Sequence, residues 1–191
     1  MTKPMPRPDA FDAEDAVIEA IAARDRYALD DFVRRHQGWV RGVVFGVLGR
    51  PNAVDDVVQQ VWTSVWERVG ELRDPRAWRP WLYRLARNAA VDAGRELTRR
   101  RKFSRVLQNE FGSRGQATRP ESAAMESEAQ RVVLDAIAGL PALYREPFVL
   151  RHVNGWSYQQ IADLMEMPVD SVETRLVRAR RMLRESLQGK V

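Results

Sequence analysis

The stretch WSYQQIADLMEMPVDSVETRLVRARRML, residues 156–183, predicts two short helices joined by a tight turn. Ser157 and Gln160 have the spacing of a capping box, in which each side chain accepts a hydrogen bond from the other residue's backbone N–H at a helix start. Pro168 lacks an amide proton and biases Met167 away from helical geometry, so the first helix should end there. A second helix should follow at once.

That second helix is expected to be amphipathic and rich in arginine, with Asp170 and Glu173 offering its cap. Its apolar stripe consists of Val172, Leu176, Ala179 and Leu183. Its cationic surface consists of Arg175, Arg178, Arg180, Arg181 and Arg184. This is the pattern of a helix-turn-helix whose second helix enters the DNA major groove. Helical bundles that never bind DNA contain similar pairs, but clustered arginines favour nucleic acid, because phosphate contacts supply most non-specific affinity.

Composition narrows the class of protein. A chain of 191 residues with 45% hydrophobic content can form one large or two small domains. The net charge of +5 and the pI near 10.0 suit a nucleic-acid partner, although a ribosome-associated or membrane-surface protein would share them. The absence of cysteine excludes disulfides, thiolate metal sites and cysteine nucleophiles.

Targeting signals are not evident. No apolar run approaches the roughly 18 residues of a membrane span, and the N-terminal MTKPMPRPDAF has prolines where a signal peptide needs an apolar core. We therefore expect a cytoplasmic protein without membrane insertion, and a disordered, proline-rich segment over residues 1–11.

Helical periodicity then dominates residues 12–103. Residues 15–36 and 39–48 carry apolar stripes, and residues 49–52 form a turn. The valines and tryptophans of residues 54–69 recur at i, i+3, i+4 and i+7, which predicts a helix in spite of the β-branched residues. Its opposite face is acidic and amide-rich. The pattern alone favours a solvated surface there, with a docking surface for a basic partner as the alternative.

The helix over residues 81–102 places Trp81 and Tyr83 beside many arginines, shortly after Trp78. Aromatic faces interleaved with cations can hold the unstacked bases of a single strand, at roughly 1–3 kcal/mol per base. The alternative, which pattern alone favours, is that the tryptophans belong to the core. Residues 104–124 then lose periodicity and gather Gly, Ser and Pro, which predicts a linker before a second helical domain.

Catalytic chemistry finds little support. His36 and His152 are the only histidines, they lie in different predicted domains, and neither has metal-ligand spacing. No Gly-rich phosphate loop or nucleophile elbow occurs. We expect no catalytic residues, no metal and no cofactor.

The order of these motifs resembles the bacterial sigma-70 family, within it the extracytoplasmic-function (ECF) group that keeps only regions 2 and 4. DDVVQQVWTSVW, residues 55–66, is similar to region 2.2, which docks on the coiled-coil of the largest RNA polymerase subunit. WLYRLARNAAVDAGR, residues 81–95, is similar to regions 2.3 and 2.4, which melt and read the −10 element. Residues 140–183 resemble region 4, which reads the −35 duplex and touches the polymerase flap.

The resemblance implies an all-α fold of two small helical domains joined by a flexible linker. Residues 12–103 would be the region 2 helical bundle, residues 104–124 the linker, and residues 125–191 the region 4 helix-turn-helix. It also implies an alternative sigma factor that binds core polymerase and promoter DNA and acts without a cofactor. Many relatives are held by an anti-sigma factor, and whether one binds here stays open.

The resemblance also implies three sets of contact residues. Polymerase docking is expected at Asp55, Asp56, Gln59, Gln60, Thr63 and Trp66. Contacts to the melted −10 strand are expected at Trp78, Trp81, Arg84, Asn88, Asp92 and Arg95. Contacts to the −35 duplex are expected at Ser157, Tyr158, Gln159, Ser171, Glu173, Thr174, Arg175 and Arg178.

One of these residues departs from the family pattern. Glu173 stands where a basic or small polar residue is common in relatives, and a carboxylate in the groove would accept a hydrogen bond from cytosine N4 and repel phosphates. The −35 preference should therefore differ. Two alternative functions stay open: a stand-alone helix-turn-helix regulator that needs no polymerase, and, disfavoured by the scarcity of reactive residues, an enzyme acting on nucleic acid.

Overall fold

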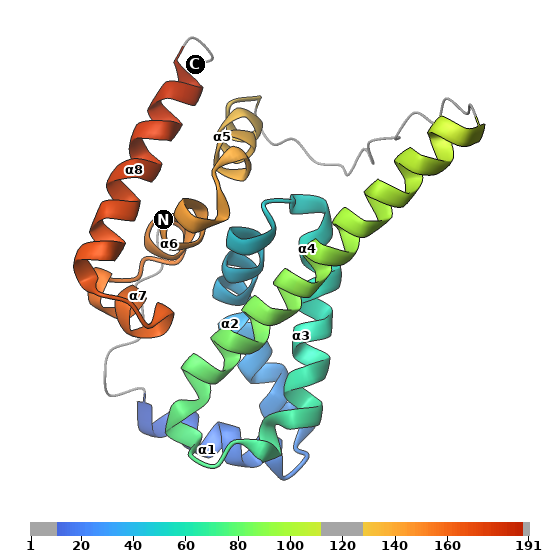
Figure 1. Ribbon diagram of the computed structural model, residues 1–191. Coiled ribbons are helices and arrows are strands. Elements are labelled where there is room, and N and C mark those ends of the chain that lie inside the picture. Colours follow the sequence, from blue (N-terminus) through green and yellow to red (C-terminus); the bar gives the residue numbers. More distant parts are fainter. Residues whose placement is uncertain (1–10, 112–127, 189–191) are drawn as a thin grey trace.

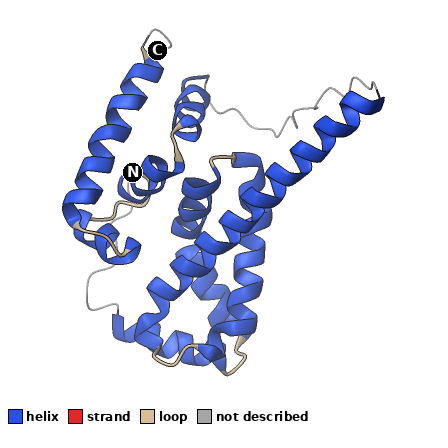
Figure 2. Ribbon diagram, viewed as in Figure 1, coloured by secondary structure: helices blue, strands red, loops and turns tan. Residues whose placement is uncertain are grey.

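The computed structural model describes residues 11–111 and 128–188, and every regular element within them is helical (Figures 1 and 2). The first group of helices consists of α1 (Phe11–Ala22), α2 (Arg26–Leu48), α3 (Val54–Arg68) and α4 (Trp78–Phe111), with 3-10 turns at Pro51–Ala53, Val69–Glu71 and Pro75–Ala77. The second group consists of α5 (Glu128–Gly139), α6 (Ala142–His152), α7 (Tyr158–Met165) and α8 (Val169–Leu187). The predicted all-α fold in two helical groups is confirmed.

The first group is organised around α2, which contacts α1, α3 and α4. The valine stripe predicted for α3 is buried against α2 and α4, with Val61 and Val65 fully inaccessible. Leu82 and Ala86 of α4 are equally buried. The period of the apolar residues, rather than their β-branched chemistry, decided the local structure.

The break between α1 and α2 differs from the prediction of one helix over residues 15–36. Arg24 has a left-handed backbone with φ 70°, and the Asp25 carboxylate accepts hydrogen bonds from the N–H groups of Tyr27 and Ala28 at 2.8 and 3.2 Å. Asp25 therefore acts as an N-cap that starts a new helix, because its side chain satisfies donors that the helix leaves free.

Helix α4 also differs from the prediction, since it continues to Phe111 and so includes residues 104–111 of the expected linker. The first glycine after Phe103 is Gly112, so no helix-breaking residue stands before that point. The remaining expected linker, residues 112–124, and the N-terminal residues 1–10 lie outside the described residues.

The second group contains the predicted pair of short helices. The capping box is present: the Gln160 N–H donates to Ser157 Oγ at 3.2 Å, and the Ser157 N–H donates to Gln160 Oε1 at 2.8 Å. The cap predicted from Asp170 and Glu173 is wrong, because Pro168 is the N-cap residue of α8 and makes no side-chain cap. Asp170 instead lies in the first turn, where a negative charge interacts favourably with the helix dipole.

Ser157→Ala should lower the free energy of unfolding by about 1 kcal/mol, because the substitution removes one half of the capping box. Urea denaturation followed by circular dichroism measures this difference. Ser157→Asp, which keeps an oxygen acceptor at the N-cap, is the matched control and should stay close to the wild type. Equal losses in both variants would argue against the capping contribution.

The two groups share one continuous apolar cluster. Helix α6 lies side by side with α2 (Figure 1), and the cluster that includes Val40 and Val43 extends to Leu150 and Trp156. The ring of Trp156 lies 5.5 Å from that of Trp39, measured between centroids. The helix-turn-helix is thereby docked on the first group in this structure.

Candidate nucleic-acid interface

The helix-turn-helix presents exposed polar side chains from both of its helices. On α8, Glu173, Thr174 and Arg178 are exposed, while Ser171 and Arg175 are half-buried. Thr174 and Arg178 lie on the face away from the buried stripe of Val172, Leu176, Ala179 and Leu183, whereas Arg175 borders that stripe. A recognition helix contacts bases mainly with its N-terminal residues, so Glu173 and Thr174 are well placed for direct readout.

The start of α7 is more constrained than the sequence indicated. The Ser157 hydroxyl is engaged in the cap, Gln159 Nε2 donates to Asp163 Oδ1 at 2.7 Å, and the Arg151 guanidinium lies 5.2 Å from the Tyr158 ring centroid. These side chains are therefore held in place before any ligand arrives, which suits contacts that position a protein on the phosphate backbone.

The surroundings of His152, at the C-terminal end of α6, are positive. Partial burial lowers the pKa of His152, and the charges of Arg151 and Arg180 lower it further. The imidazole is therefore neutral at pH 7. The same local field would attract a polyanion.

Four residues of α4 that are predicted to contact the −10 strand form a line along one helix face. Arg84, Asn88, Asp92 and Arg95 are all exposed and follow one another at intervals of four, four and three residues. Arg95 Nη1 lies 3.4 Å from Asp92 Oδ1, a surface contact that costs little to break. Trp81 is half-buried and packs against the core beside this line.

Trp78 does not belong to this surface. Its side chain is 1% exposed, and its ring lies 5.2 Å from that of Phe32 and 4.7 Å from that of His36. The turn at Pro75–Ala77, capped by Asp74, directs the indole into α2. The prediction that Trp78 contacts the −10 strand is corrected here: the buried indole is a core residue, the alternative that the pattern itself favoured.

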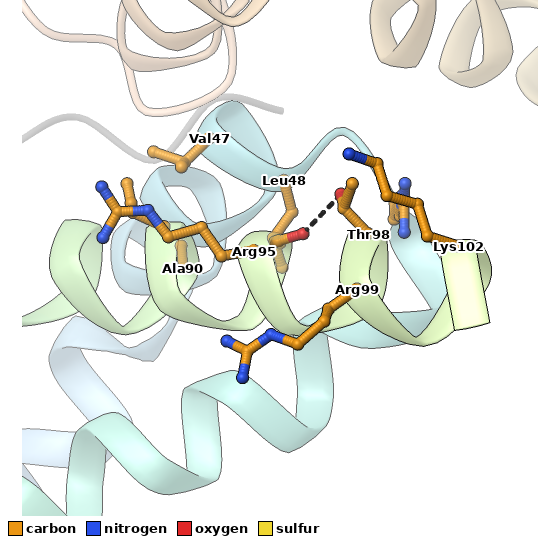
Figure 3. Close-up of a pocket in the computed structure, with 10 residues that line it drawn as sticks. Val47, Leu48, Ala90, Arg95, Thr98, Arg99 and Lys102 are labelled. Carbon is orange, nitrogen blue, oxygen red and sulfur yellow. Dashed lines mark hydrogen bonds between the residues drawn. The ribbon is translucent and has the colours of Figure 1, made fainter.

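A cationic pocket continues the α4 line toward the C-terminal end of that helix (Figure 3). It encloses about 540 Å³ over the apolar Val47, Leu48 and Ala90. Its cations are Arg50, Arg95, Arg99 and Lys102, and none of the described residues that line it is acidic. The sequence contained a signal for this pocket, since positions 95, 99 and 102 share one helical face.

The predicted docking residues gather on α3. Asp56, Gln59, Gln60 and Thr63, together with Ser64, line a shallow hollow of about 540 Å³. Asp55 lies beside it and pairs with Arg41. Trp66 is half-buried, and the Arg24 guanidinium lies 5.2 Å from its ring centroid and donates to its carbonyl. The structure thus brings the polar members of this set together around the hollow, which Trp66 does not line.

Sequence reasoning missed the seam between α2, α4 and α6. The guanidinium of Arg145 on α6 is buried among backbone carbonyls: its Nε donates to Gly46 O at 2.8 Å and its Nη2 to Val47 O at 2.8 Å. Its Nη1 donates to Ala138 O and Leu140 O, both at 2.6 Å. Arg145 therefore satisfies carbonyls at the C-terminal end of α2, which a helix cannot pair internally.

Glu146, the next residue, holds two side chains of α4. The Tyr83 hydroxyl donates to Glu146 Oε1 at 2.6 Å, and Arg87 Nε donates to the same oxygen at 3.1 Å and to Oε2 at 3.4 Å. Burial and the Glu146 carboxylate both raise the pKa of Tyr83, so its phenol stays protonated and donates. Glu166, in the turn of the helix-turn-helix, lies 3.5 Å from Arg84.

Two glycines of α2, and Gly49 at its C-cap, make room for α6 and the residues that follow it. A Cβ at Gly46 would lie 3.1 Å from the Cα of Glu146, one at Gly42 would meet the Asn154 side chain, and one at Gly49 would meet the Arg145 guanidinium. Gly49 also has φ +62°, which a side chain would strain. Their spacing of four and three residues, visible in the sequence, marks one helix face and is the signal that could have revealed the seam.

No helix in the described ranges has both the length and the apolarity to cross a membrane. No group of three or more His, Asp or Glu side chains there is arranged to hold a metal ion.

Comparison with known families finds two matches along the chain. Residues 32–101 match the model of Sigma-70 region 2, and residues 130–183 match that of Sigma-70, region 4. The chain is 30% identical over 181 residues to the ECF RNA polymerase sigma-E factor of Haemophilus influenzae, covering 92% of this chain and 95% of the relative. It is 30% identical over 178 residues to the RNA polymerase sigma-H factor of Pseudomonas aeruginosa, covering 90% and 92%.

Solved structures give the same result for the fold. The structure of CnrH in complex with the cytosolic domain of CnrY has a TM-score of 0.63 and 25% identity, covering 94% of this chain and 99% of CnrH. The sigma factor RpoE from Bartonella quintana, in complex with the anti-sigma factor NepR, has a TM-score of 0.56 and 21% identity, covering 84% and 99%.

Proposed function

Since this chain belongs to the ECF group of the sigma-70 family, and is an alternative sigma factor that directs transcription initiation, we propose that it divides the work among three helices. Helix α3 binds core RNA polymerase, α4 holds the melted −10 strand, and α8 reads the −35 duplex. The observation that carries this proposal is that one chain presents an acidic and amide-lined hollow and two separate arginine-bearing helices.

Docking on polymerase uses the hollow of Asp56, Gln59, Gln60 and Thr63, with Asp55 beside it. In a protein of net charge +5, an acidic face suits a basic protein partner rather than DNA. We take this partner to be the coiled-coil of the largest polymerase subunit, with the region 4 helices touching the flap.

Reading of the −35 duplex uses the N-terminal half of α8. Glu173 and Thr174 face base edges, with the Glu173 carboxylate accepting from a cytosine N4, while Arg175 and Arg178 bind the backbone. Ser157, Tyr158, Gln159 and Ser171 position the motif on phosphates. A cytosine contacted by Glu173 would distinguish this promoter class.

Melting at −10 is driven by binding, without nucleotide hydrolysis. Extruding a base costs a few kcal/mol, which stacking and hydrogen bonds from a preformed surface can offset. Trp81 with Arg84, Asn88, Asp92 and Arg95 supplies that surface. The neighbouring cationic pocket would lie under phosphates of the duplex next to the melted segment.

The protein would act in the cytoplasm with polymerase and would need no cofactor. We also propose an anti-sigma factor as a partner, since two structural neighbours of this chain are found in complexes, CnrH with the cytosolic domain of CnrY and RpoE with the anti-sigma factor NepR.

The proposal is tested by run-off transcription on a genomic library with core polymerase, paired with gel-shift assays with and without core. We expect transcripts from a defined promoter class and specific DNA binding that depends on core. High-affinity operator binding by the free protein, unchanged by polymerase, would instead identify a stand-alone regulator. Cleavage or modification of DNA by the purified protein would identify an enzyme.

The cationic pocket gives a prediction about salt. In the holoenzyme bound to its promoter, Arg99→Ala and Lys102→Ala should each reduce the slope of log affinity against log salt concentration by about 0.9, because each variant loses one phosphate contact. Arg34→Ala, an exposed arginine on α2 that pairs with Asp31, is the matched control and should leave the slope unchanged. Unchanged slopes in all three variants would place the DNA elsewhere.

A further inference from the structure

We propose that Tyr83 and Arg87 form an anion site on α4, which the Glu146 carboxylate occupies in the closed chain and a backbone phosphate of the melted −10 strand occupies when the two helical groups separate. The proposal rests on the proposed function, because it names a further contact of the same DNA strand. It adds that the second helical group and the strand compete for one site.

The geometry of the site is that of an anion receptor. Tyr83 and Arg87 stand one turn apart on α4, and their donors converge on a single carboxylate at 2.6 and 3.1 Å. The Glu146 side chain is 5% exposed, whereas that of Arg87 is 46% exposed, so the receptor borders solvent on the arginine side. Carboxylate and phosphate oxygens accept the same charge-assisted hydrogen bonds, so a phosphate can replace the carboxylate.

The site is continuous with the −10 surface. Arg87 stands three residues after Arg84 on α4, so these two side chains are neighbours on the helix surface. Arg84 is itself paired with Glu166, so the second group places two carboxylates against the helix that would otherwise hold a polyanion. In the closed chain these two carboxylates stand in for the charge of the DNA strand.

The seam explains how the carboxylate is kept in the site. Arg145, the neighbour of Glu146, is fixed by carbonyls of α2 and by the Leu140 carbonyl between α5 and α6, and Gly46 allows the Glu146 backbone to approach α2 closely. Because α6 covers Tyr83, a strand can bind there only after α6 moves away. A binding-competent state that is rarely populated lowers apparent affinity by its population, so the free chain should bind single strands weakly.

The first experiment opens the seam without touching the site. Gly46→Leu places a side chain against the Glu146 backbone, whereas Gly38→Leu on the same helix meets nothing within 4 Å and is the matched control. The chain has no cysteine, so Glu19→Cys and Ser186→Cys can carry two dyes for energy transfer. The probe is a single-stranded oligonucleotide of the −10 non-template strand from the promoter found by run-off transcription.

We expect Gly46→Leu to lower energy transfer and to raise the affinity of the free chain for this oligonucleotide about tenfold, and Gly38→Leu to change neither. Glu146→Gln, which removes the competing charge without a steric change, should act in the same direction. Adding Arg87→Ala to Gly46→Leu should abolish the gain. An opened chain with unchanged affinity, or a gain that survives Arg87→Ala, would overturn the proposal.

The second experiment uses the holoenzyme. Arg87→Ala should weaken binding of the −10 oligonucleotide about tenfold, and Tyr83→Phe should weaken it by a smaller factor, because each loses a hydrogen bond to a charged group. Arg87→Lys should recover part of the loss. Binding to core and to a −35 duplex should not change. Full strand affinity in Arg87→Ala would overturn this site alone, whereas a wild-type chain that fails to bind core would instead overturn the proposed function.

Discussion

Asp56→Arg combined with Gln60→Ala should weaken binding to core RNA polymerase at least about a hundredfold while leaving the helical fold intact. Both side chains are exposed and line the hollow on α3, so the substitutions disturb no core contact. Reversing the charge of Asp56 places a cation against a basic partner, and like charges at an interface cost several kcal/mol. Co-purification with core polymerase and size-exclusion chromatography measure the loss.

The matched control for this variant is Glu19→Arg, which makes the same charge reversal at an exposed position on α1. It should bind core as the wild type does. Circular dichroism should give the same helix content for all three proteins. Co-purification of the double variant with core in normal yield would show that α3 does not carry the docking surface.

Arg145→Met should lower the free energy of unfolding by about 3 kcal/mol and separate the two helical groups. The substitution removes a guanidinium that donates to four backbone carbonyls, and hydrogen bonds to charged groups contribute about 1.5–3 kcal/mol each. The expected loss is smaller than four such hydrogen bonds would contribute, because burying the guanidinium charge has a desolvation cost. The same desolvation lowers the pKa of Arg145. Methionine keeps much of the side-chain volume, so the loss reports on polar contacts.

Urea denaturation and the energy-transfer pair described above measure the two effects together. Arg145→Lys is the control, since an ammonium keeps the charge but cannot reach carbonyls of two helices as a planar fork does. It should fall between the wild type and Arg145→Met. A methionine variant with wild-type stability and unchanged energy transfer would show that the seam is held by its apolar contacts alone.

The hollow on α3 and the seam are separate surfaces. The docking hollow lies on α3, whereas the seam is formed by α2, α4 and α6. The hollow is therefore accessible while the chain is closed. If core also draws the second helical group away, by contact with the flap, docking would free the anion site for the promoter strand. Such an order would keep the free sigma factor from occupying single-stranded DNA.

Most of the architecture was predictable because helical signals are local. The apolar period of α3 predicted both its helix and its buried face, and the Ser157 and Gln160 pair predicted the start of α7. The polar side of α3 and the arginine side of α8 follow from the same periods, since a residue that is not on the buried stripe faces outward. Errors were also local, as at Asp25 and Asp170, where one side chain decided which residue caps a helix.

The period of the apolar residues does not predict which part of the chain packs against each helix face. Trp78 and Trp81 are similar in sequence context, yet only the packed core shows that Trp78 is fully buried against α2 while Trp81 is half-buried. Tyr83 and Glu146 are 63 residues apart, and Arg145 reaches a carbonyl 99 residues away. Contacts at such separations depend on how the apolar faces of two helices pack against each other. A sequence with a helical period is compatible with many such packing arrangements.

The amino-acid order therefore determined the helices, their buried stripes and the membership of the sigma-70 family. Tertiary structure alone decided that the Glu146 carboxylate accepts hydrogen bonds from Tyr83 and Arg87 of α4, and that Gly42, Gly46 and Gly49 leave room for the side chains and backbone of residues 145–154. The physical reason is the sequence separation over which each kind of interaction acts. Hydrogen bonding within a helix spans four residues, whereas charge pairing and close packing between helices act through space, without regard to distance along the chain.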